Sequence, residues 1–211
     1  RFGNDLLAWH TAKMKYTRSC AVSSIVGHVL GIGDRHSHNI LIHQKTGEVV
    51  HIDFGIVFES GKTLPTPEVV PFRLTRDIVD GMGPTGTDGT FSRSSEATIR
   101  TLRENAGALL TILSAVVSDP LYEWKKSAAR ARVQQTTGGE SIETEDSETA
   151  DEDSNDAGSR ALAKIHEKLQ GYEEGTSSER QSEEGQVQLL INSAKDPDNL
   201  CVLFPGWSPW L

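Results

Sequence analysis

The stretch GIGDRHSHNILIHQKTGEVVHIDFG, residues 31–55, decides the fold of this chain. It contains two β-rich runs, NILIH at residues 39–43 and EVVHID at residues 48–53, which the turn sequence QKTG separates. Two such runs around a short glycine-containing turn predict a β-hairpin, with Gly47 in the turn. The loop that enters the hairpin, residues 32–39, should therefore lie close to the point where the second strand ends.

Helical patterns flank the hairpin on both sides. In residues 16–31 apolar side chains recur every three to four positions, which predicts a core-facing helix that Gly31 ends. The apolar positions of this helix are Val22, Ile25, Val26, Val29 and Leu30. Residues 95–119 predict one long helix closed by Pro120, and further helices are expected at residues 121–135, 160–171 and 184–196.

Proline breaks the pattern between the hairpin and the long helix. Residues 54–73 contain three prolines and predict a long ordered loop, and such loops inside compact domains are usually functional. At the other end, residues 200–211 are rich in large apolar side chains, so we expect this end to dock on the rest of the chain. The expected fold class is α+β, mostly helical, with one small β-hairpin.

Composition excludes several classes of protein. The chain has 211 residues, 36% of them hydrophobic, which is enough for a core, and no apolar run is long enough to span a membrane. Two cysteines at opposite ends of the chain argue against a disulfide framework and against a cysteine-rich zinc site. The chain opens on Arg1 without a signal-peptide pattern, and we expect it to be a fragment.

The net charge of −9 comes from one segment. Residues 137–159 hold nine acidic residues and no Lys or Arg, and the rest of the chain is balanced. We expect residues 136–159 to be a disordered linker, because they cannot bury enough apolar surface to offset the entropy of ordering. No basic stripe argues for direct nucleic-acid binding.

Asp34, Asn39 and Asp53 have the spacing from which a function can be argued. Protein kinases orient the attacking hydroxyl with the Asp of H-R-D-L-x-x-x-N and bind metal with that Asn and with the Asp of a later D-F-G. Here Asn39 follows Asp34 by five positions, and Asp53-Phe54-Gly55 follows on the far strand. The first triplet is reversed, however, and reads Asp34-Arg35-His36.

The predicted hairpin would bring Asn39, at its entry, beside Asp53, at its exit. Amide and carboxylate oxygens suit a hard cation such as Mg²⁺, which bridges the phosphates of a bound nucleotide. Gly33 and Gly55 allow backbone conformations that a Cβ would resist, as suits a loop close to a polyphosphate. These residues predict an ATP and Mg²⁺ site, with Mn²⁺ as an alternative ion.

The reversed GDRHxxN followed by HIDFG resembles the catalytic and metal-binding motifs of the phosphatidylinositol 3-kinase superfamily. The downstream ESGKTLPTPEVVPFRLTRDIVDGMG resembles the activation segment of its protein-kinase branch, the phosphatidylinositol 3-kinase-related kinases. Within that branch, TPEVVPFRLTRDIVDGMGPTG and the ending DPDNLCVLFPGWSPWL are similar to the ATM type, including its fungal telomere-maintenance members. The ending resembles the FATC segment of these proteins.

The resemblance implies a role for each matched residue. Asp34 would orient or deprotonate a substrate Ser or Thr hydroxyl, and His36 would contact the γ-phosphate or share the proton transfer. Asn39 and Asp53 would hold Mg²⁺, with Gly33, Phe54 and Gly55 beside the nucleotide. The spacing leaves open which of Asp34 and His36 takes the proton. The residues expected to present the substrate are Lys62, Pro67, Glu68, Pro71, Phe72 and Arg73.

The resemblance also implies a layout and partners. We expect the helical C-lobe of a bilobal kinase at residues 1–135, the linker at 136–159, a regulatory helix region at 160–178 and the FATC segment at 179–211. Expected partners are protein substrates with Ser or Thr followed by Gln, a second copy of the parent chain and a DNA-break sensor complex, with no membrane contact. The expected location is the nucleus, in the double-strand-break response and telomere maintenance.

Three other functions stay open. A phosphoinositide lipid kinase is disfavoured because Lys62 is the only basic residue between Asp53 and Phe72, and an anionic headgroup calls for several. A metal-dependent phosphohydrolase could use His51 with Asp53, and a non-catalytic interaction module could use the aromatic terminus. No glycine-rich phosphate loop or strand-borne Lys precedes Asp34, so we expect the 211-residue chain alone to phosphorylate nothing.

Overall fold

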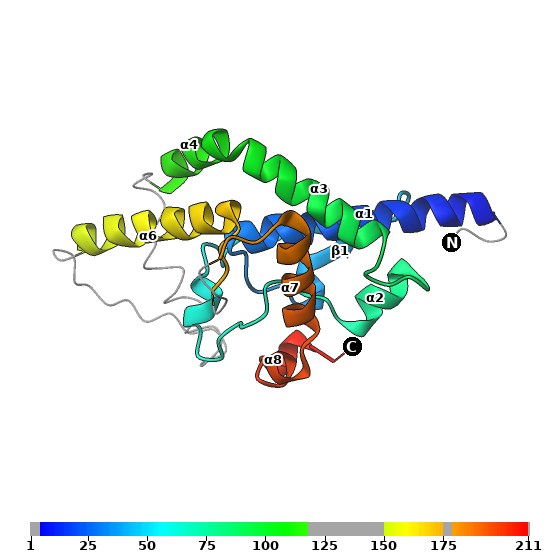
Figure 1. Ribbon diagram of the computed structural model, residues 1–211. Helices are drawn as coiled ribbons and strands as arrows, with labels where there is room; N and C mark the ends of the chain where they lie inside the picture. The colour runs from blue at the N-terminus through cyan, green and yellow to red at the C-terminus, as the bar shows by residue number, and fades with distance from the viewer. Residues whose placement is uncertain (1–4, 118–149, 175–178, 211) are drawn as a thin grey trace.

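The computed structural model describes residues 5–117, 150–174 and 179–210. Its longest helix, α1 (Leu6–Leu30), runs through the middle of the molecule, with α3 (Thr90–Glu104) and α4 (Ala106–Val117) above it in Figure 1. Helix α2 (Arg76–Met82) lies below the other end of α3. The predicted helix at residues 121–135 and the part of the predicted linker at 136–149 lie outside the described residues.

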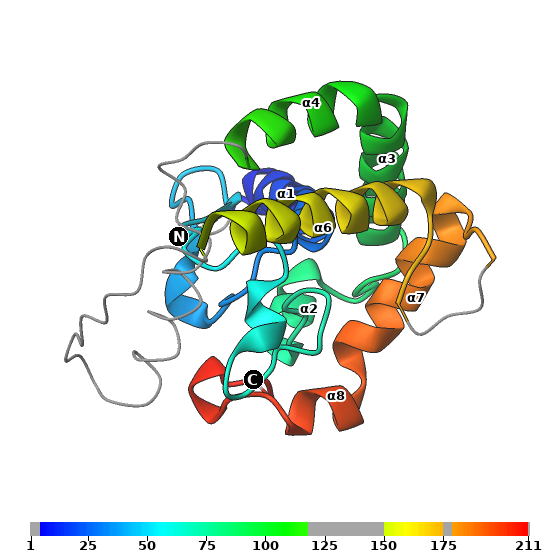
Figure 2. The ribbon, with the colours of Figure 1, turned by 90° about the vertical axis from the view of Figure 1, so that its left-hand side faces the viewer.

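The remaining helices follow the undescribed segment. Helix α6 (Ala150–Gln170) lies beside α1 and below α4, and the later segment forms α7 (Glu183–Lys195) and α8 (Pro197–Cys201), as the side view in Figure 2 shows. Three short 3₁₀ helices complete the described structure: η1 (Ser37–Asn39), η2 (Ser60–Thr63) and η3 (Pro205–Trp207). Among the described helices none is long and apolar enough to cross a membrane.

The predicted hairpin is present as β1 (Ile40–Ile42) and β2 (Val49–His51), paired antiparallel with Ile40 opposite His51. Gly47 has a φ of +80°, the left-handed conformation expected of a turn glycine. The expected α+β fold, mostly helical with one small hairpin, is therefore confirmed.

Helix α1 begins and ends as its sequence dictates. The Asp5 side chain accepts a hydrogen bond from the backbone N–H of Ala8 and so caps the N-terminus. Gly31 ends the helix in the left-handed conformation, and a Cβ at this position would lie 2.4 Å from the backbone N of Glu59. The chain can therefore pass close to the segment that follows the hairpin only because residue 31 is glycine.

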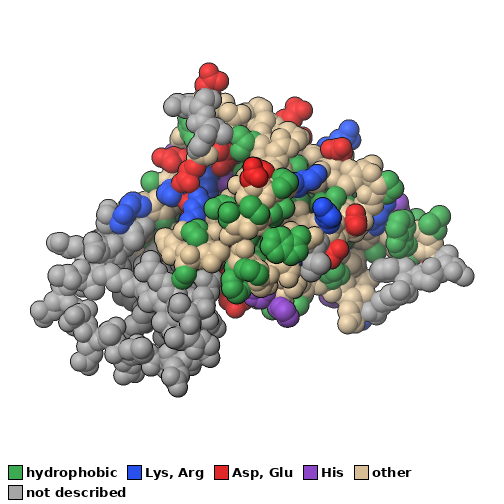
Figure 3. Space-filling model, turned by 90° about the horizontal axis from the view of Figure 1, so that it is seen from below, with side chains coloured by type: hydrophobic (Ala, Val, Ile, Leu, Met, Phe, Trp, Pro, Cys, Tyr) green, Lys and Arg blue, Asp and Glu red, His purple; other side chains and the backbone are tan. Residues whose placement is uncertain are grey.

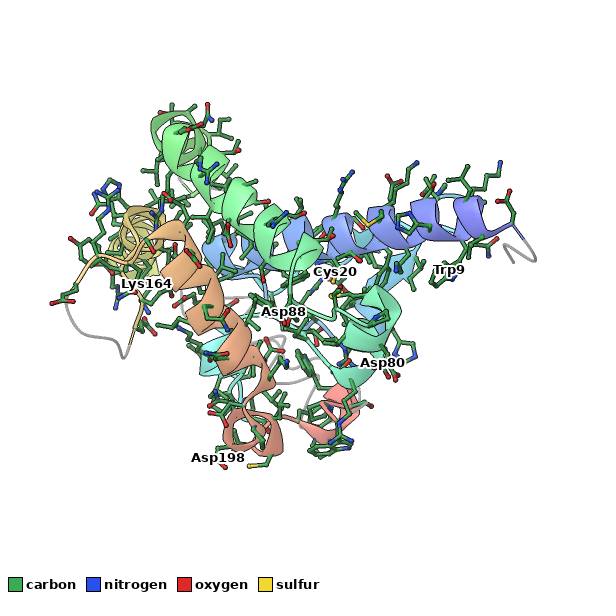
Figure 4. All side chains as sticks on the ribbon, turned by 45° about the vertical axis from the view of Figure 1, so that its right-hand side comes forward. Trp9, Cys20, Asp80, Asp88, Lys164 and Asp198 are labelled. Carbon is green, nitrogen blue, oxygen red and sulfur yellow. The ribbon has the colours of Figure 1, made fainter. Side chains whose placement is uncertain are left out.

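Two apolar clusters hold the helices together. The larger one joins α1, β2, α2, α3 and α7, with Ile25, Phe91 and Ala194 completely buried in it. The smaller one joins the end of α1 to α4 and α6 through Val29, Leu113, Ile165 and Leu169. Figure 4 shows Cys20, a buried member of the larger cluster, on α1 near its crossing with α3. Burial raises the pKa of the Cys20 thiol to about 12.

The structure corrects three expectations. The predicted long helix at residues 95–119 is divided at Asn105, whose side-chain amide donates to the carbonyl of Thr101 and competes with the helix. Helix α6 begins at Ala150, so residues 150–159 of the predicted disordered linker are helical. Val22, expected in the core, is 44% exposed.

The C-terminal segment docks only in part. Leu203 and Trp207 are buried, whereas Val202, Phe204 and Trp210 are about half exposed. Figure 3 shows the lower face of the molecule, where hydrophobic side chains gather in the middle and charged side chains lie around them.

Candidate functional site

The loop that enters the hairpin is held against the segment that leaves it. Gly33 N–H donates to the carbonyl of Ile56 at 2.9 Å, and Glu59 N–H donates to the carbonyl of Gly31 at 2.9 Å. Phe58 N–H donates likewise to Leu30. Residues 30–33, just before the predicted catalytic residues, therefore lie beside residues 56–59, where the segment after the hairpin begins.

Asp34 is the centre of a small polar group. The Asn39 amide nitrogen donates to the backbone carbonyl of Asp34 at 2.9 Å and to its carboxylate at 3.3 Å. The Nε2 atom of His36 lies 3.7 Å from the same carboxylate. The side chains of Asp34 and His36 are 38% and 29% exposed, so both face solvent and can meet a substrate. The structure thus brings together three of the predicted site residues.

Asn39 and Asp53 occupy adjoining positions on the two sides of the hairpin. The backbone N–H of Ile52 donates to the carbonyl of Asn39 at 3.0 Å, and Asp53 follows Ile52 directly. The Asp53 carboxylate accepts the N–H of Gly55 at 3.0 Å, and no hydrogen bond joins the side chains of Asn39 and Asp53 in the described structure. The side-chain nitrogen of Asn39 donates to Asp34, and its backbone carbonyl accepts from Ile52. The side-chain oxygen Oδ1 is therefore the atom of Asn39 that could bind a cation.

Arg35, which the sequence did not single out, lies at the centre of this site. It is 4% exposed, and its Nε and Nη1 atoms donate to the carbonyls of Gly33 and Ile52, each at 2.8 Å. Its Nη2 atom donates to the carbonyl of Asp53, and the guanidinium carbon lies 5.7 Å from the centroid of the Phe54 ring. The only signal in the sequence was its place between Asp34 and His36.

Glu68 reaches the same loop from the activation segment. Both of its carboxylate oxygens accept the backbone N–H of Asp34, each at 2.9 Å. Burial raises the pKa of Glu68, although the bond from Asp34 and the charge of Arg35 act in the opposite direction. Glu68 therefore connects the expected substrate-presenting segment to the residue expected to meet the substrate hydroxyl.

The other predicted substrate residues are dispersed. Pro67 and Pro71 line a cavity of about 460 Å³ together with Glu68, whereas Phe72 is buried in the larger apolar cluster. Arg73 donates to the carbonyls of Trp207 and Ser208, with its guanidinium carbon 4.8 Å from the centroid of the Trp207 ring. Phe72 and Arg73 thus anchor the activation segment to the protein interior and to the C-terminal segment, and do not face the polar group around Asp34.

Lys62 belongs to a network of ion pairs with helix α6 and the segment after it. Lys62 and Lys164 each bind Glu59 and Glu174, at distances between 2.7 and 3.1 Å. Lys168 also binds Glu59, and its side chain is 9% exposed. Figure 4 places Lys164 on α6, far from Trp9 at the start of α1. Sequence reasoning missed this network because its members lie about 100 residues apart.

The lysines of this network favour the ionised form of Glu59. Burial alone would raise the pKa of Glu59, but Lys168, Lys164 and Lys62 overcome it and lower this pKa to about 2. Nearby, His28 lies 2.9 Å from Glu173, and both side chains are buried. Burial and the charge of Lys168 lower the pKa of His28. His28, which showed no signal in the sequence, lines the cavity of about 460 Å³ together with Glu173.

A zinc-type site does not form around His51. Burial, with the charge of Arg35, lowers the pKa of His51 to about 4, so its ring is neutral at physiological pH. Across the described ranges no three His, Cys, Asp or Glu side chains gather in a way that could hold a metal ion. A pair made of Asn39 and Asp53 contains only one such residue and would need oxygen atoms from the nucleotide to complete its shell.

Comparison with known proteins agrees with this geometry. The family model described as phosphatidylinositol 3- and 4-kinase matches residues 3–126, and the FATC domain model matches residues 180–211. The chain is 49% identical over 205 residues to "Serine/threonine-protein kinase ATM" of Arabidopsis thaliana, covering 96% of this chain and 5% of that protein. It is 45% identical over 219 residues to "Serine-protein kinase ATM" of Sus scrofa, covering 98% of this chain and 7% of that protein.

A solved structure shows the same relationship. The structure titled "Tel1 kinase butterfly symmetric dimer" superposes with a TM-score of 0.80 at 44% identity, covering 97% of this chain and 8% of that one. The chain therefore spans only a small part of the length of the relatives it matches. The family models together cover the hairpin, the polar group around Asp34 and the docked C-terminal segment. The chain belongs to the phosphatidylinositol 3- and 4-kinase family, is homologous to the ATM and Tel1 kinases, and carries a FATC domain.

Proposed function

We propose that this chain is the catalytic segment of a serine/threonine protein kinase of the ATM type, which transfers the γ-phosphoryl group of ATP. The observation that carries the proposal is the group formed by Asp34, His36 and Asn39 where the chain enters the hairpin. Asn39 is bonded through its backbone to Ile52, the residue before Asp53. Its carboxylate and imidazole are exposed to a substrate, and its oxygen atoms suit a hard cation.

Each residue has a distinct task in this proposal. Asp34 accepts a hydrogen bond from the substrate hydroxyl and orients it, and His36 contacts the transferred phosphoryl group or shares the proton. Asn39 and Asp53 hold Mg²⁺ or Mn²⁺ through oxygen atoms; when bound, the ion neutralises charge on the phosphates. Gly33, Phe54 and Gly55 line the nucleotide side, with Gly55 N–H holding the Asp53 carboxylate.

A protein substrate fits the activation segment better than a lipid headgroup. Lys62, the only basic residue between Asp53 and Phe72, is engaged by the carboxylates of Glu59 and Glu174 and so is poorly placed to receive a phosphorylated inositol. We propose that residues 55–76, with Pro67, Glu68 and Pro71 at the cavity, present a Ser or Thr followed by Gln.

The setting of the parent protein follows from its relatives. We propose a nuclear protein of the double-strand-break response and telomere maintenance, recruited by a DNA-break sensor complex. Solved relatives are titled as Tel1 dimers, which supports a homodimer formed through the parent chain. The 211-residue chain alone is expected to be inactive, because residues 1–33 do not hold a glycine-rich phosphate loop.

The test uses the full-length parent with ATP and Mg²⁺ on paired peptides that contain Ser-Gln or Ser-Ala. Gln-dependent phosphorylation that Asp53→Asn abolishes supports the proposal. Phosphorylation of a phosphoinositide in preference to either peptide would select the lipid kinase. Metal-dependent hydrolysis of a phosphate ester without ATP would select the phosphohydrolase, and an absence of all three activities would leave an interaction module.

A further inference from the structure

We propose that Arg35 is the positioning residue that sets the conformation of Asp53 for metal binding. This inference rests on the proposed function and adds to it a residue with no assigned role. Arg35 does not reach the substrate or the metal; it acts on the backbone from which the Asp53 carboxylate projects.

The hydrogen bonds of Arg35 add to the backbone bonds that already join the loop before the hairpin to the segment after it. The guanidinium donates to the carbonyl of Gly33, in the loop before Asp34, and to the carbonyls of Ile52 and Asp53, at the end of the hairpin. Three backbone acceptors on one buried side chain fix the catalytic loop relative to the metal-binding segment.

Asp53 needs such support because of its backbone conformation. It has a φ of +58°, in the left-handed region, where a residue with a Cβ persists only if its surroundings hold it there. Arg35 holds the peptide carbonyl on each side of this residue, Ile52 before it and Asp53 itself after it. The direction in which the Asp53 carboxylate leaves the backbone is thereby fixed.

Charge supports the same role. Burial lowers the pKa of Arg35, and three acids act in the opposite direction by favouring the charged guanidinium, namely Asp34, Asp53 and Glu68. The Phe54 ring, 5.7 Å from the guanidinium, covers the cation on another side.

Lysine cannot replace arginine in this position. Three different nitrogen atoms of the planar guanidinium donate to three carbonyls, whereas an ammonium group offers one nitrogen at a different reach. The change Arg35→Lys therefore keeps the positive charge and removes most of the hydrogen bonds to the backbone. It separates the contribution of the charge from that of the hydrogen bonds.

The experiment measures two properties of the full-length parent as a function of Mg²⁺ concentration: equilibrium binding of a fluorescent ATP analogue, and the peptide phosphorylation rate at saturating ATP and peptide. We expect the Mg²⁺ requirement of both to shift in the same direction. We expect Arg35→Lys to raise the Mg²⁺ concentration for half-maximal rate by about tenfold or more, as is usual when a residue that orients a metal ligand is lost. The KM for peptide should stay within about twofold, since Arg35 does not face the substrate. The control is Arg100→Lys, an exposed arginine on α3, which should leave the metal dependence unchanged.

A second variant keeps the test decisive if Arg35→Lys fails to accumulate. Arg35→Ala leaves a space that added guanidinium ion can fill, and we expect millimolar guanidinium, but not methylammonium at equal ionic strength, to restore the metal dependence. An unchanged metal dependence in both variants, or rescue by methylammonium as effective as by guanidinium, would overturn the inference. A wild-type parent without activity, or an active Asp53→Asn variant, would instead overturn the proposed function.

Discussion

The carboxylate of Glu68 accepts the backbone N–H of Asp34 with both oxygens, at 2.9 Å each. The two residues are 34 positions apart, and the bond joins the expected activation segment to the loop that enters the hairpin. Beside them, the Cβ of any residue replacing Gly33 would lie 2.5 Å from a Glu68 oxygen. The acid is therefore enclosed by the loop that it holds, and several predictions about activity depend on this arrangement.

Removing Glu68 should impair catalysis without removing the nucleotide site. In Glu68→Ala the buried N–H of Asp34 loses its acceptor, which costs about 1–3 kcal/mol, or up to about 100-fold in kcat/KM if the cost falls on the transition state. Glu68→Gln retains an acceptor oxygen and should lose less. Peptide kinase assays of the parent check this order, with the exposed Glu104→Ala as control. Equal activity of Glu68→Ala and Glu104→Ala would refute it.

Removing the imidazole at His36 should lower turnover while nucleotide binding persists. The Nε2 atom of His36 lies 3.7 Å from the Asp34 carboxylate, so His36→Ala removes the imidazole next to the residue expected to meet the substrate hydroxyl. We expect kcat to fall by about 100-fold or more, the range for a group that assists proton transfer. Equilibrium binding of a fluorescent ATP analogue with Mg²⁺ measures the nucleotide affinity of the variant. Loss of this binding would place His36 among the metal-binding residues instead.

Trp207 should carry most of the docking energy of the C-terminal segment. It is 4% exposed and stacked by Arg73, so Trp207→Ala should cost about 3–5 kcal/mol through the cavity that it leaves. Trp210 is the matched control, since it is 55% exposed and its truncation should cost far less. Hydrogen exchange of residues 67–75 in the parent reports the difference. Equal protection in both variants would mean that the tail does not hold the activation segment.

Glu59 should stabilise the start of the activation segment over the whole physiological pH range. Its pKa is about 2, below the ordinary value of 4.5, so its contribution is complete above pH 4.5 and is lost as the pH falls from there toward 2. A shift of this size corresponds to about 3 kcal/mol. Glu59→Gln should therefore lower the protection of residues 56–64 in hydrogen exchange equally at pH 5 and pH 8.

The control for this prediction is Glu174→Gln. Glu174 binds the same Lys62 and Lys164 but is 60% exposed, and an exposed ion pair contributes only about 0–1 kcal/mol. A Glu59→Gln effect that grows or shrinks between pH 5 and pH 8, or one no larger than that of Glu174→Gln, would show that another group controls the segment.

Local patterns predicted the elements that place the site. The hairpin followed from strand residues around Gly47, and the end of α1 followed from Gly31, because both signals lie within a few residues. The spacing of five positions selected Asp34 and Asn39 as candidates, but it did not predict the hydrogen bond between their side chains. The helix stripe was less accurate, since Cys20, Ala21 and Ser24 are buried and Val22 is not.

Contacts between distant segments were beyond the reach of the sequence. The bond from Glu68 to Asp34, the ion pairs from α6 to Glu59 and the docking of Arg73 on Trp207 each join residues far apart in the chain. A charged residue alone does not reveal whether it is buried against a partner or solvated. Arg35 was missed for the same reason, because its three acceptors are backbone carbonyls, which every residue has.

Asp34 and Asp53 share a property that affects how their variants should be interpreted. Both have positive φ, +56° and +58°, a conformation that asparagine and aspartate tolerate better than alanine. An inactive alanine variant at either position would combine loss of the carboxylate with a rearranged loop, and the two losses could not be separated. Asparagine, which keeps the shape and removes only the charge, is the informative substitution at both sites.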